Sequence, residues 1–277
     1  MVPLWQAGLM SPARPGRPRL RKREIAFAVA AGVVAAGGAA LMLDNGGGGG
    51  GGPPELAYGG ARAMTYQVAD FDGISTSGPQ DVVVTQGETF AVRSEGSPQA
   101  LAQLEAVNVD GTLTIRPKNG FNWGNWRSLS GATFYVTLPR LDSVAVAGSG
   151  DIRVDRIEAP SFEGTIAGSG ELSIAQMQVD EADFKIAGGG NVQAQGTARE
   201  ARVAIGGSGD VSAAGLRSET ASVSIGGSGD VALTVADEAK ISIMGSGNVD
   251  IDGPGRCQVT RFGSGEVRCD GGGGTDD

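Results

Sequence analysis

A short sequence motif recurs seven times between residues 148 and 266, and each copy ends on a side chain whose oxygen could coordinate a cation. Each copy is a Gly-x-Gly followed directly by an acidic or amide residue. Carboxylate and amide oxygens are the ligands that Ca²⁺ takes in proteins, so one interpretation is a strip of cation or ligand sites along one edge of a repeating structure. These residues form the acidic column: Asp151, Glu171, Asn191, Asp210, Asp230, Asn248 and Glu266.

The spacing also permits a structural interpretation of the acidic column. The calcium turns of Gly-Gly-x-Gly-x-Asp nonapeptide repeats place their Asp one residue further on and occur twice per coil. Here the acid follows the second glycine directly and occurs once per repeat. Short acidic and amide side chains also cap backbone N–H groups after turns and oppose association between sheet edges. We favour this structural role, and we assign no metal, no cofactor and no catalytic residue.

The repeat length indicates which elements carry these side chains. The first glycines follow one another at intervals of 20, 20, 19, 20, 18 and 18 residues, a period typical of a solenoid. Mostly aliphatic residues stand two and four positions before the first glycine and four and six positions after it, and Arg261 is the one polar exception. Alternation of this kind is typical of half-buried strands. In the first copy these residues are Val144, Val146, Ile152 and Val154.

The sequence therefore predicts an all-β fold, a right-handed parallel β-helix with coils of 18 to 20 residues. Each coil consists of a strand, the Gly-x-Gly turn, a second strand and a more variable turn. An antiparallel sandwich or barrel is the alternative for short, regularly spaced strands. That fold does not require the same residue type at the same offset seven times, so we favour the stacked parallel arrangement.

The region before the repeats carries similar chemistry less regularly. Residues 78–81, Gly-Pro-Gln-Asp, form a degenerate version of the turn, and residues 110–111, Asp-Gly, separate two short strand candidates. Ser97 followed by Pro98 predicts a helix that begins there and extends to Glu105. We expect this atypical segment, with its short helix, to cap the N-terminal end of the solenoid.

Composition divides the chain into six expected regions. Residues 25–43 contain no charged side chain, and nineteen residues at about 1.5 Å each roughly span a bilayer core. The segment is either an uncleaved anchor, which we favour, or a cleaved signal peptide. The regions are a basic cytoplasmic leader (1–24), a transmembrane anchor or signal peptide (25–43), a Gly-rich linker (44–60), irregular N-terminal coils and cap (61–140), regular solenoid repeats (141–270) and a disordered tail (271–277).

Charge and histidine content restrict the function. The net charge is −9, and residues 1–52 hold six basic and two acidic side chains, or +4, which leaves −13 for residues 53–277. An acidic domain lacks the basic footprint that nucleic acids require. The sequence contains no histidine, which removes the commonest general base and metal ligand. We expect a protein that is not an enzyme and does not bind nucleic acid.

The two cysteines are placed symmetrically about the last turn. Cys257 lies six residues before Gly263, Cys269 lies six residues after it, and both fall in inward-facing positions. In an oxidising compartment a disulfide would close the last coil, while two buried free thiols are the alternative.

Aromatic residues gather in one Gly- and Asn-rich segment, residues 119–130. We call Phe121, Trp123 and Trp126 the aromatic loop. Exposed aromatic side chains form platforms for sugars or partner proteins. Alternatively, the same residues cover the first coil as part of the cap.

With the repeats aligned, the chain resembles the head GIN domain family of autotransporter adhesins over about residues 68 to 270. The resemblance implies an exported β-helical domain, often near a signal or membrane segment, with no catalytic residues. The segments that carry it are Phe71–Ile74, Asp81–Gly87, Asp110–Ile115 and Tyr135–Leu141, which leads into the first Gly-Ser-Gly-Asp.

We therefore expect a non-enzymatic cell-envelope protein whose rigid solenoid offers a surface for adhesion or protein contact. Its partner would be an envelope protein or a glycan, and it would contact the membrane through residues 25–43 if these are uncleaved. Its location would be periplasmic or on the cell surface, with a cytoplasmic N-terminus if the anchor remains. The alternative is a carbohydrate-binding or polysaccharide-acting β-helix protein, which fold alone supports only by analogy.

Overall fold

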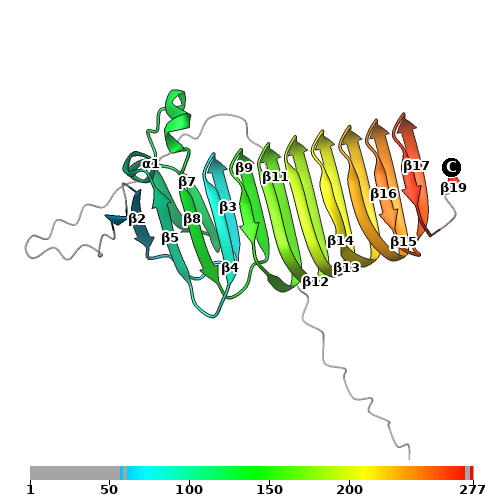
Figure 1. The fold of residues 1–277 in the computed structure, drawn as a ribbon, viewed down its shortest axis with the longest axis horizontal. Coiled ribbons are helices and arrows are strands. Elements are labelled where there is room, and N and C mark those ends of the chain that lie inside the picture. Colours follow the sequence, from blue (N-terminus) through cyan, green and yellow to red (C-terminus); the bar gives the residue numbers. More distant parts are fainter. Residues whose placement is uncertain (1–56, 59–60, 272–274, 277) are drawn as a thin grey trace, which may run out of the picture. The chain divides into compact units, whose positions relative to one another are not determined.

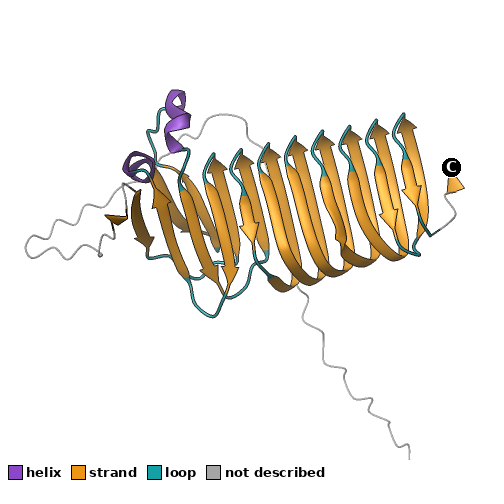
Figure 2. Cartoon of the chain, viewed as in Figure 1, coloured by secondary structure: helices purple, strands orange, loops and turns teal. Residues whose placement is uncertain are grey.

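The structure is a computed structural model that describes residues 57–58, 61–271 and 275–276. Its strands join in one hydrogen-bonded sheet that winds into stacked coils, with one short α-helix and one 3₁₀ helix near the N-terminal end (Figures 1 and 2). The predicted leader and the predicted membrane or signal helix lie outside the described residues. No helix in the described part is long and apolar enough to cross a membrane.

Residues 143–269 form the regular coils, and the predicted parallel solenoid is confirmed. Each strand pairs in parallel with the strand one coil away, and the first glycines of successive turns lie in register, as Gly168 does with Gly188. The strands are β9 (Ser143–Gly148), β10 (Ile152–Val154), β11 (Ile157–Gly168), β12 (Glu171–Gly188), β13 (Asn191–Gly207), β14 (Val211–Gly227), β15 (Val231–Gly245), β16 (Val249–Asp252), β17 (Arg256–Gly263) and β18 (Val267–Cys269).

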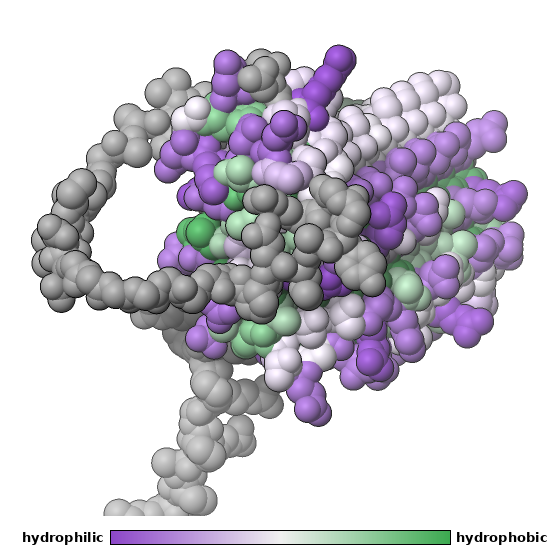
Figure 3. Space-filling model, turned by 60° about the vertical axis from the view of Figure 1, so that its left-hand side comes forward, coloured by the Kyte–Doolittle hydropathy of each residue, from purple (hydrophilic) through white to green (hydrophobic). Residues whose placement is uncertain are grey.

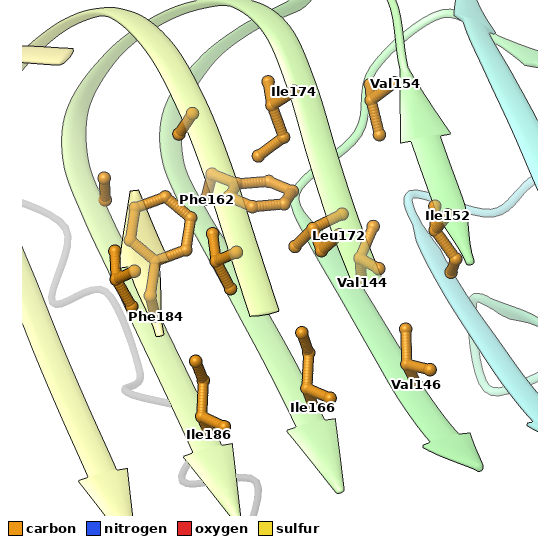
Figure 4. Packing of buried hydrophobic residues seen from close by; sticks show 14 of the residues in the cluster. Val144, Val146, Ile152, Val154, Phe162, Ile166, Leu172, Ile174, Phe184 and Ile186 are labelled. Carbon is orange, nitrogen blue, oxygen red and sulfur yellow. The ribbon is translucent and has the colours of Figure 1, made fainter. Parts of the chain in front are cut away.

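The core lies inside the coils and is filled by the inward columns (Figure 4). At two inward positions, one coil has a large residue where the neighbouring coil has a small one. Phe162 is followed two residues later by Gly164, and the next coil places Ala182 and Phe184 at the same positions. A Cβ on Gly164 would lie 3.2 Å from the ring of Phe184, so the glycine makes room for both phenylalanines. Core packing in which a large residue faces a small one leaves no void.

Each turn depends on glycine at its first position. The first glycines of the seven turns have φ between +130° and +150°, which side chains of L-residues rarely adopt. A Cβ on Gly168 would also overlap the carbonyl oxygen of Gly148 in the preceding coil. Close approach of backbone to backbone therefore excludes any side chain at this point.

Coil length varies without disturbing the columns because the second turn absorbs the difference. The interval from Gly188 to Gly207 is one residue shorter than the preceding interval. The β12–β13 register shifts by one residue between Ile174 and Met177, where Gly196 lies opposite Met177 with φ of +129°. Pairing then continues in register to the next Gly-x-Gly turn.

The degenerate turn at residues 78–81 is part of a further coil. Gly78 pairs with Gly148, and Val82 pairs with Ile152, in the same parallel register as in the later coils. Gln80 occupies the place of the second glycine, and its fully buried side chain donates to Thr76 Oγ1 at 2.9 Å. The strands are β3 (Gly73–Gly78) and β4 (Asp81–Gln86), against which β7 (Thr112–Pro117) and β8 (Thr133–Leu138) stack in parallel.

Beyond this coil the pairing becomes antiparallel, which the sequence reasoning did not anticipate. Four strand pairs, β1–β2, β2–β5, β5–β8 and β6–β7, are antiparallel. In the β6–β7 hairpin, Asp110 and Gly111 both have positive φ, the geometry of a tight two-residue hairpin turn. The additional strands are β1 (Ala57–Tyr58), within the predicted linker, β2 (Ala61–Tyr66), β5 (Ala91–Gly96) and β6 (Leu104–Val109).

The predicted capping helix is confirmed as α1 (Pro98–Gln103). Ala100 N–H donates to Ser97 Oγ at 3.1 Å, so Ser97 is the N-cap, and Pro98 is the first helical residue. The helix ends two residues earlier than predicted, because Leu104 and Glu105 enter strand β6. Leu101 is buried against the end of the core. The cap thus covers apolar surface that the terminal coil would expose.

The C-terminal end is finished differently. The inward position two residues before the first glycine is aliphatic in six coils but is occupied by Arg261 in the last. Its side chain turns back and donates to Gly265 O at 2.9 Å. A charged residue at an inward position of the terminal coil opposes pairing of this sheet edge with another strand. Thr275–Asp276, in the predicted disordered tail, form the short strand β19 against β17.

Substitutions in the turn at residues 188–190, which consists of three glycines, test whether the close approach of successive turns requires glycine. Gly188→Ala introduces a Cβ that overlaps Gly168 O at a φ of +130°, and we expect it to destabilise the fold by about 2–4 kcal/mol. Gly189→Ala is the matched control, because a Cβ added there would have no atom within 4 Å. Thermal unfolding should show a large loss for the first variant and none for the second; equal melting temperatures would contradict the constraint.

Candidate functional site

The acidic column forms a ladder of hydrogen bonds from coil to coil, with one interruption. A side-chain oxygen of one member accepts the backbone N–H of the member in the next coil. Asp210 N–H donates to Asn191 Oδ1 at 3.2 Å, and Asp230 N–H donates to Asp210 Oδ1 at 2.9 Å. Asn248 N–H donates to Asp230 Oδ1 at 2.9 Å, and Glu266 N–H donates to Asn248 Oδ1 at 3.0 Å. The short side chains thus satisfy backbone donors just after each turn.

The length of the side chain decides whether a member can accept this bond. Glu171 N–H donates to Asp151 Oδ1 at 3.1 Å, as in the other coils. Glu171 itself has one more methylene, and the next N–H, that of Asn191, donates to the backbone oxygen of Gly170 instead. The ladder is therefore interrupted where Glu replaces Asp or Asn.

The ladder begins one coil earlier than sequence reasoning placed it. Asp151 N–H donates to Asp81 Oδ1 at 3.1 Å, so Asp81 is the first member. Its position was available as a signal, because Asp81 stands three residues after Gly78, as Asp151 stands after Gly148. Pro and Gln in place of Ser and Gly concealed the match.

A shallow groove of about 500 Å³ runs along the acidic column over the last coils. Asp210, Asp230 and Glu266 line it together with Asp250 and Arg268, which form an ion pair with each other. One cation among four carboxylates leaves the groove negative. Among the residues with described positions, no three Cys, Asp or Glu side chains are grouped closely enough to hold a metal ion.

The aromatic loop belongs to the N-terminal cap. Trp123 begins the 3₁₀ helix η1 (Trp123–Leu129), and Phe121 packs partly buried against the core. Trp126 is 45% exposed, with the guanidinium of Arg127 5.8 Å from the centroid of its ring. The loop therefore has one side in the core and one tryptophan in solvent. It lies on different elements from the acidic column, and the two do not form one site.

The two cysteines meet inside the last coil. Cys257 and Cys269 form a disulfide with a Cα–Cα distance of 6.5 Å. Cys257 is buried and Cys269 partly buried. The bridge crosses the interior of the coil that has no following neighbour in the regular stack.

The sheet face that leads into the turns carries scattered ion pairs. Lys185 Nζ lies 3.1 Å from Glu163 Oε1 and 3.1 Å from Asp183 Oδ2. Burial lowers the pKa of Lys185, but hydrogen bonds and charge attraction from these two carboxylates outweigh it and raise the pKa above its usual value. This cation is therefore held by its own neighbours.

The coils and part of the cap lie within a region that matches a known protein family. Residues 70–255 match the family model described as "Putative auto-transporter adhesin, head GIN domain". The chain belongs to this family. The family description is that of an exported or surface protein, and it describes adhesion rather than catalysis. No protein of curated function is significantly similar in sequence.

Solved structures share the fold of this head GIN domain. A "putative adhesin" from Bacteroides fragilis has a TM-score of 0.68 at 20% identity, covering 76% of this chain and 97% of that one. A "putative lipid binding protein" from Parabacteroides distasonis has a TM-score of 0.62 at 20% identity, covering 76% and 96%. A "putative adhesin" from Parabacteroides merdae has a TM-score of 0.57 at 18% identity, covering 76% and 97%. At these identities the likeness shows the fold alone.

Substitution of Asp230 separates the backbone-capping role from a cation role. Asp230→Ala removes the acceptor of the Asn248 N–H, and we expect a loss of about 1 kcal/mol in unfolding free energy. Asp230→Asn keeps an acceptor oxygen and should retain the stability. Thermal unfolding of both variants, with and without Ca²⁺, makes the distinction. A calcium-dependent stabilisation that Asp230→Asn abolishes would instead support a cation strip.

Proposed function

We propose that this head GIN domain is a non-enzymatic binding module of the cell envelope, whose rigid solenoid presents lateral surfaces for adhesion or protein contact. The observation that carries the proposal is the continuity of the coils. Parallel pairing joins the coil of β3 and β4 to all the later coils up to β18, one buried core lies inside the coils, and the outer side chains repeat in register. A scaffold of this kind holds its outer residues in fixed rows, which suits recognition of an extended partner.

The aromatic loop is the first place to look for a ligand. Trp126 is a large, exposed aromatic side chain beside the cation Arg127, at the N-terminal end of the solenoid. Tryptophan and arginine are enriched at the centres of binding interfaces, and an aromatic face also stacks against sugar rings. The same exposed tryptophan favours the second candidate, binding of a carbohydrate.

A ligand screen on the full-length chain tests both candidates. A glycan array and a pull-down from envelope extract are performed with the parent chain and with Trp126→Ala. We expect selective capture of one ligand, weakened by at least about tenfold in the variant, because truncation of a central aromatic typically costs about 2 kcal/mol or more. Val109→Ala, which trims another exposed apolar residue, is the control and should bind normally. Turnover of a bound glycan would overturn the non-enzyme proposal.

The location proposed for the chain is the envelope, with residues 25–43 as an uncleaved anchor and residues 1–24 in the cytoplasm. The absence of charge in residues 25–43, and the basic cluster that precedes them, support this orientation. The domain would then be on the outer side of the cytoplasmic membrane, connected to the anchor by the Gly-rich linker.

Mass spectrometry of the chain isolated from membranes tests the anchor. We expect an intact chain that retains the basic leader and fractionates with membranes. A mature N-terminus close to residue 41, with release into the soluble fraction, would show that residues 25–43 are a signal peptide. Replacement of Val33 by Arg should disrupt membrane association of an anchor, since a central charge costs about 2.5–3.5 kcal/mol.

A further inference from the structure

Two large apolar side chains stand in solvent near the C-terminal end of the solenoid. Met244 is 68% exposed and Phe262 is 69% exposed. They lie in neighbouring coils and are paired in register between β15 and β17. Exposed neighbouring apolar residues of this size indicate an interaction surface when their surroundings are compatible with one.

Both residues belong to one column, the pre-turn column, which immediately precedes the first glycine of each turn. The column contains small residues in five coils and large residues in the last two. From the N-terminal to the C-terminal coil it consists of Ala147, Ala167, Ala187, Gly206, Gly226, Met244 and Phe262.

Neither backbone conformation nor packing within the chain requires glycine at the two glycine positions of this column. Neither Gly206 nor Gly226 has a positive φ, and the pairing between them shows no bulge. A Cβ would lie 3.8 Å from the nearest atom at Gly206 and 3.7 Å at Gly226, which is ordinary contact. Glycine in a strand costs about 0.5–1 kcal/mol relative to alanine. Such a glycine often marks a place where another molecule approaches closely.

The positions that flank this part of the column along the strands carry no charge. In the same four coils, the positions two residues before and two residues after the column are all small or hydroxyl-bearing. Charge depletion around aromatic and methionine side chains is typical of the centre of a protein interface. A pale band of near-neutral hydropathy runs along the turn edge of the coils (Figure 3). The flanking residues are Ala204, Ser224, Ser242, Thr260, Ser208, Ser228, Ser246 and Ser264.

We propose that a second copy of the chain docks on this face, with the order of its coils reversed. Coils are evenly spaced at about 4.8 Å. A two-fold axis that lies parallel to the strands, midway between the coils of Gly226 and Met244, therefore places the column of one copy on the same column of the other in reversed order. Met244 of each copy then lies on Gly226 of the other, and Phe262 lies on Gly206. Each large residue fills the space that a missing side chain leaves, and the contact is isologous, as in most dimers.

On the strand side of this face the charges are compatible with the reversed order, whereas on the turn side the reversal places Asp210 and Glu266 of the acidic column at the same level, as like charges. The column four residues before the pre-turn column contains Arg202, Ser222, Lys240 and Gln258 in these four coils. Reversal places Arg202 opposite Gln258 and Lys240 opposite Ser222. Neither cation therefore faces a like charge. Arg202 is further held by Glu200 and Glu181 of its own chain.

The area indicates a weak and reversible dimer. Four coils at about 4.8 Å and five residues at about 3.3 Å give roughly 300 Å² per copy, or roughly 600 Å² in total. Specific, stable interfaces bury about 1,200–2,000 Å², so this contact belongs among the small, transient ones.

Filling the glycines tests the proposal without damage to the fold. Gly206→Val and Gly226→Val each add a Cβ that makes only ordinary contact with the neighbouring strand, and valine favours strands, so the melting temperature of the monomer should stay equal or rise. The same changes fill the spaces in which Phe262 and Met244 of the second copy would lie. Sedimentation equilibrium of the full-length chain should therefore show dimerisation at least about tenfold weaker. Ala187→Val, one coil outside the overlap, is the matched control and should dimerise normally.

The register is tested by cross-linking two singly substituted chains. Chains with Gly206→Cys and with Phe262→Cys, carrying different tags, are mixed and mildly oxidised. We expect a disulfide-linked heterodimer from the mixture and none from either variant alone, because equivalent positions lie about three coils apart, beyond the reach of a disulfide. A monomeric parent chain at about 1 mM, dimerisation unchanged by the valines, or cross-linking of either variant with itself would overturn the proposal. The first result would assign Phe262 and Met244 to a different occupant, such as a lipid surface or another protein.

Discussion

The stacking of glycine on glycine at each turn is the constraint on which the solenoid depends. The first glycine of a turn approaches the backbone of the preceding first glycine too closely for a Cβ, while the N–H of the following residue donates to that glycine's carbonyl oxygen. This bond is 2.9 Å long from Ser169 to Gly148 and from Ser208 to Gly188. Because every coil returns to the same point, each residue is placed in a fixed column, and differences in coil length are confined to the opposite turn.

The acidic column is a consequence of that fixed return. Its members follow the turn directly, where the backbone N–H of the next coil needs an acceptor, and Asp and Asn are short enough to provide one. The bond is lost after Glu171, whose side chain is longer. A row of carboxylates thus arises from the geometry of the turn. The groove beside it is negative because the same residues line it.

The two ends of the solenoid are protected by different means, while its sides stay open. At the N-terminal end, pairing changes from parallel to antiparallel and α1 covers the core. At the C-terminal end, Arg261 replaces an aliphatic residue and the disulfide crosses the coil. Both devices oppose growth by edge pairing. Contacts with other molecules are therefore expected on the lateral faces and on the cap, where Met244, Phe262 and Trp126 are exposed.

The sequence by itself determined the parallel coils, their period, the inward columns and the N-cap at Ser97, because each is a local or strictly periodic property of side-chain type. It did not determine the antiparallel cap, since pairing direction between strands distant in sequence depends on how the chain returns. It also hid the coil that begins at Gly78, where Gln80 replaces a glycine. Only the tertiary structure showed that the acidic column bonds side chain to backbone across coils, and that Met244 and Phe262 share a face with two glycines that have room for a side chain. Those relations exist only after coils about 4.8 Å apart bring residues from different repeats together.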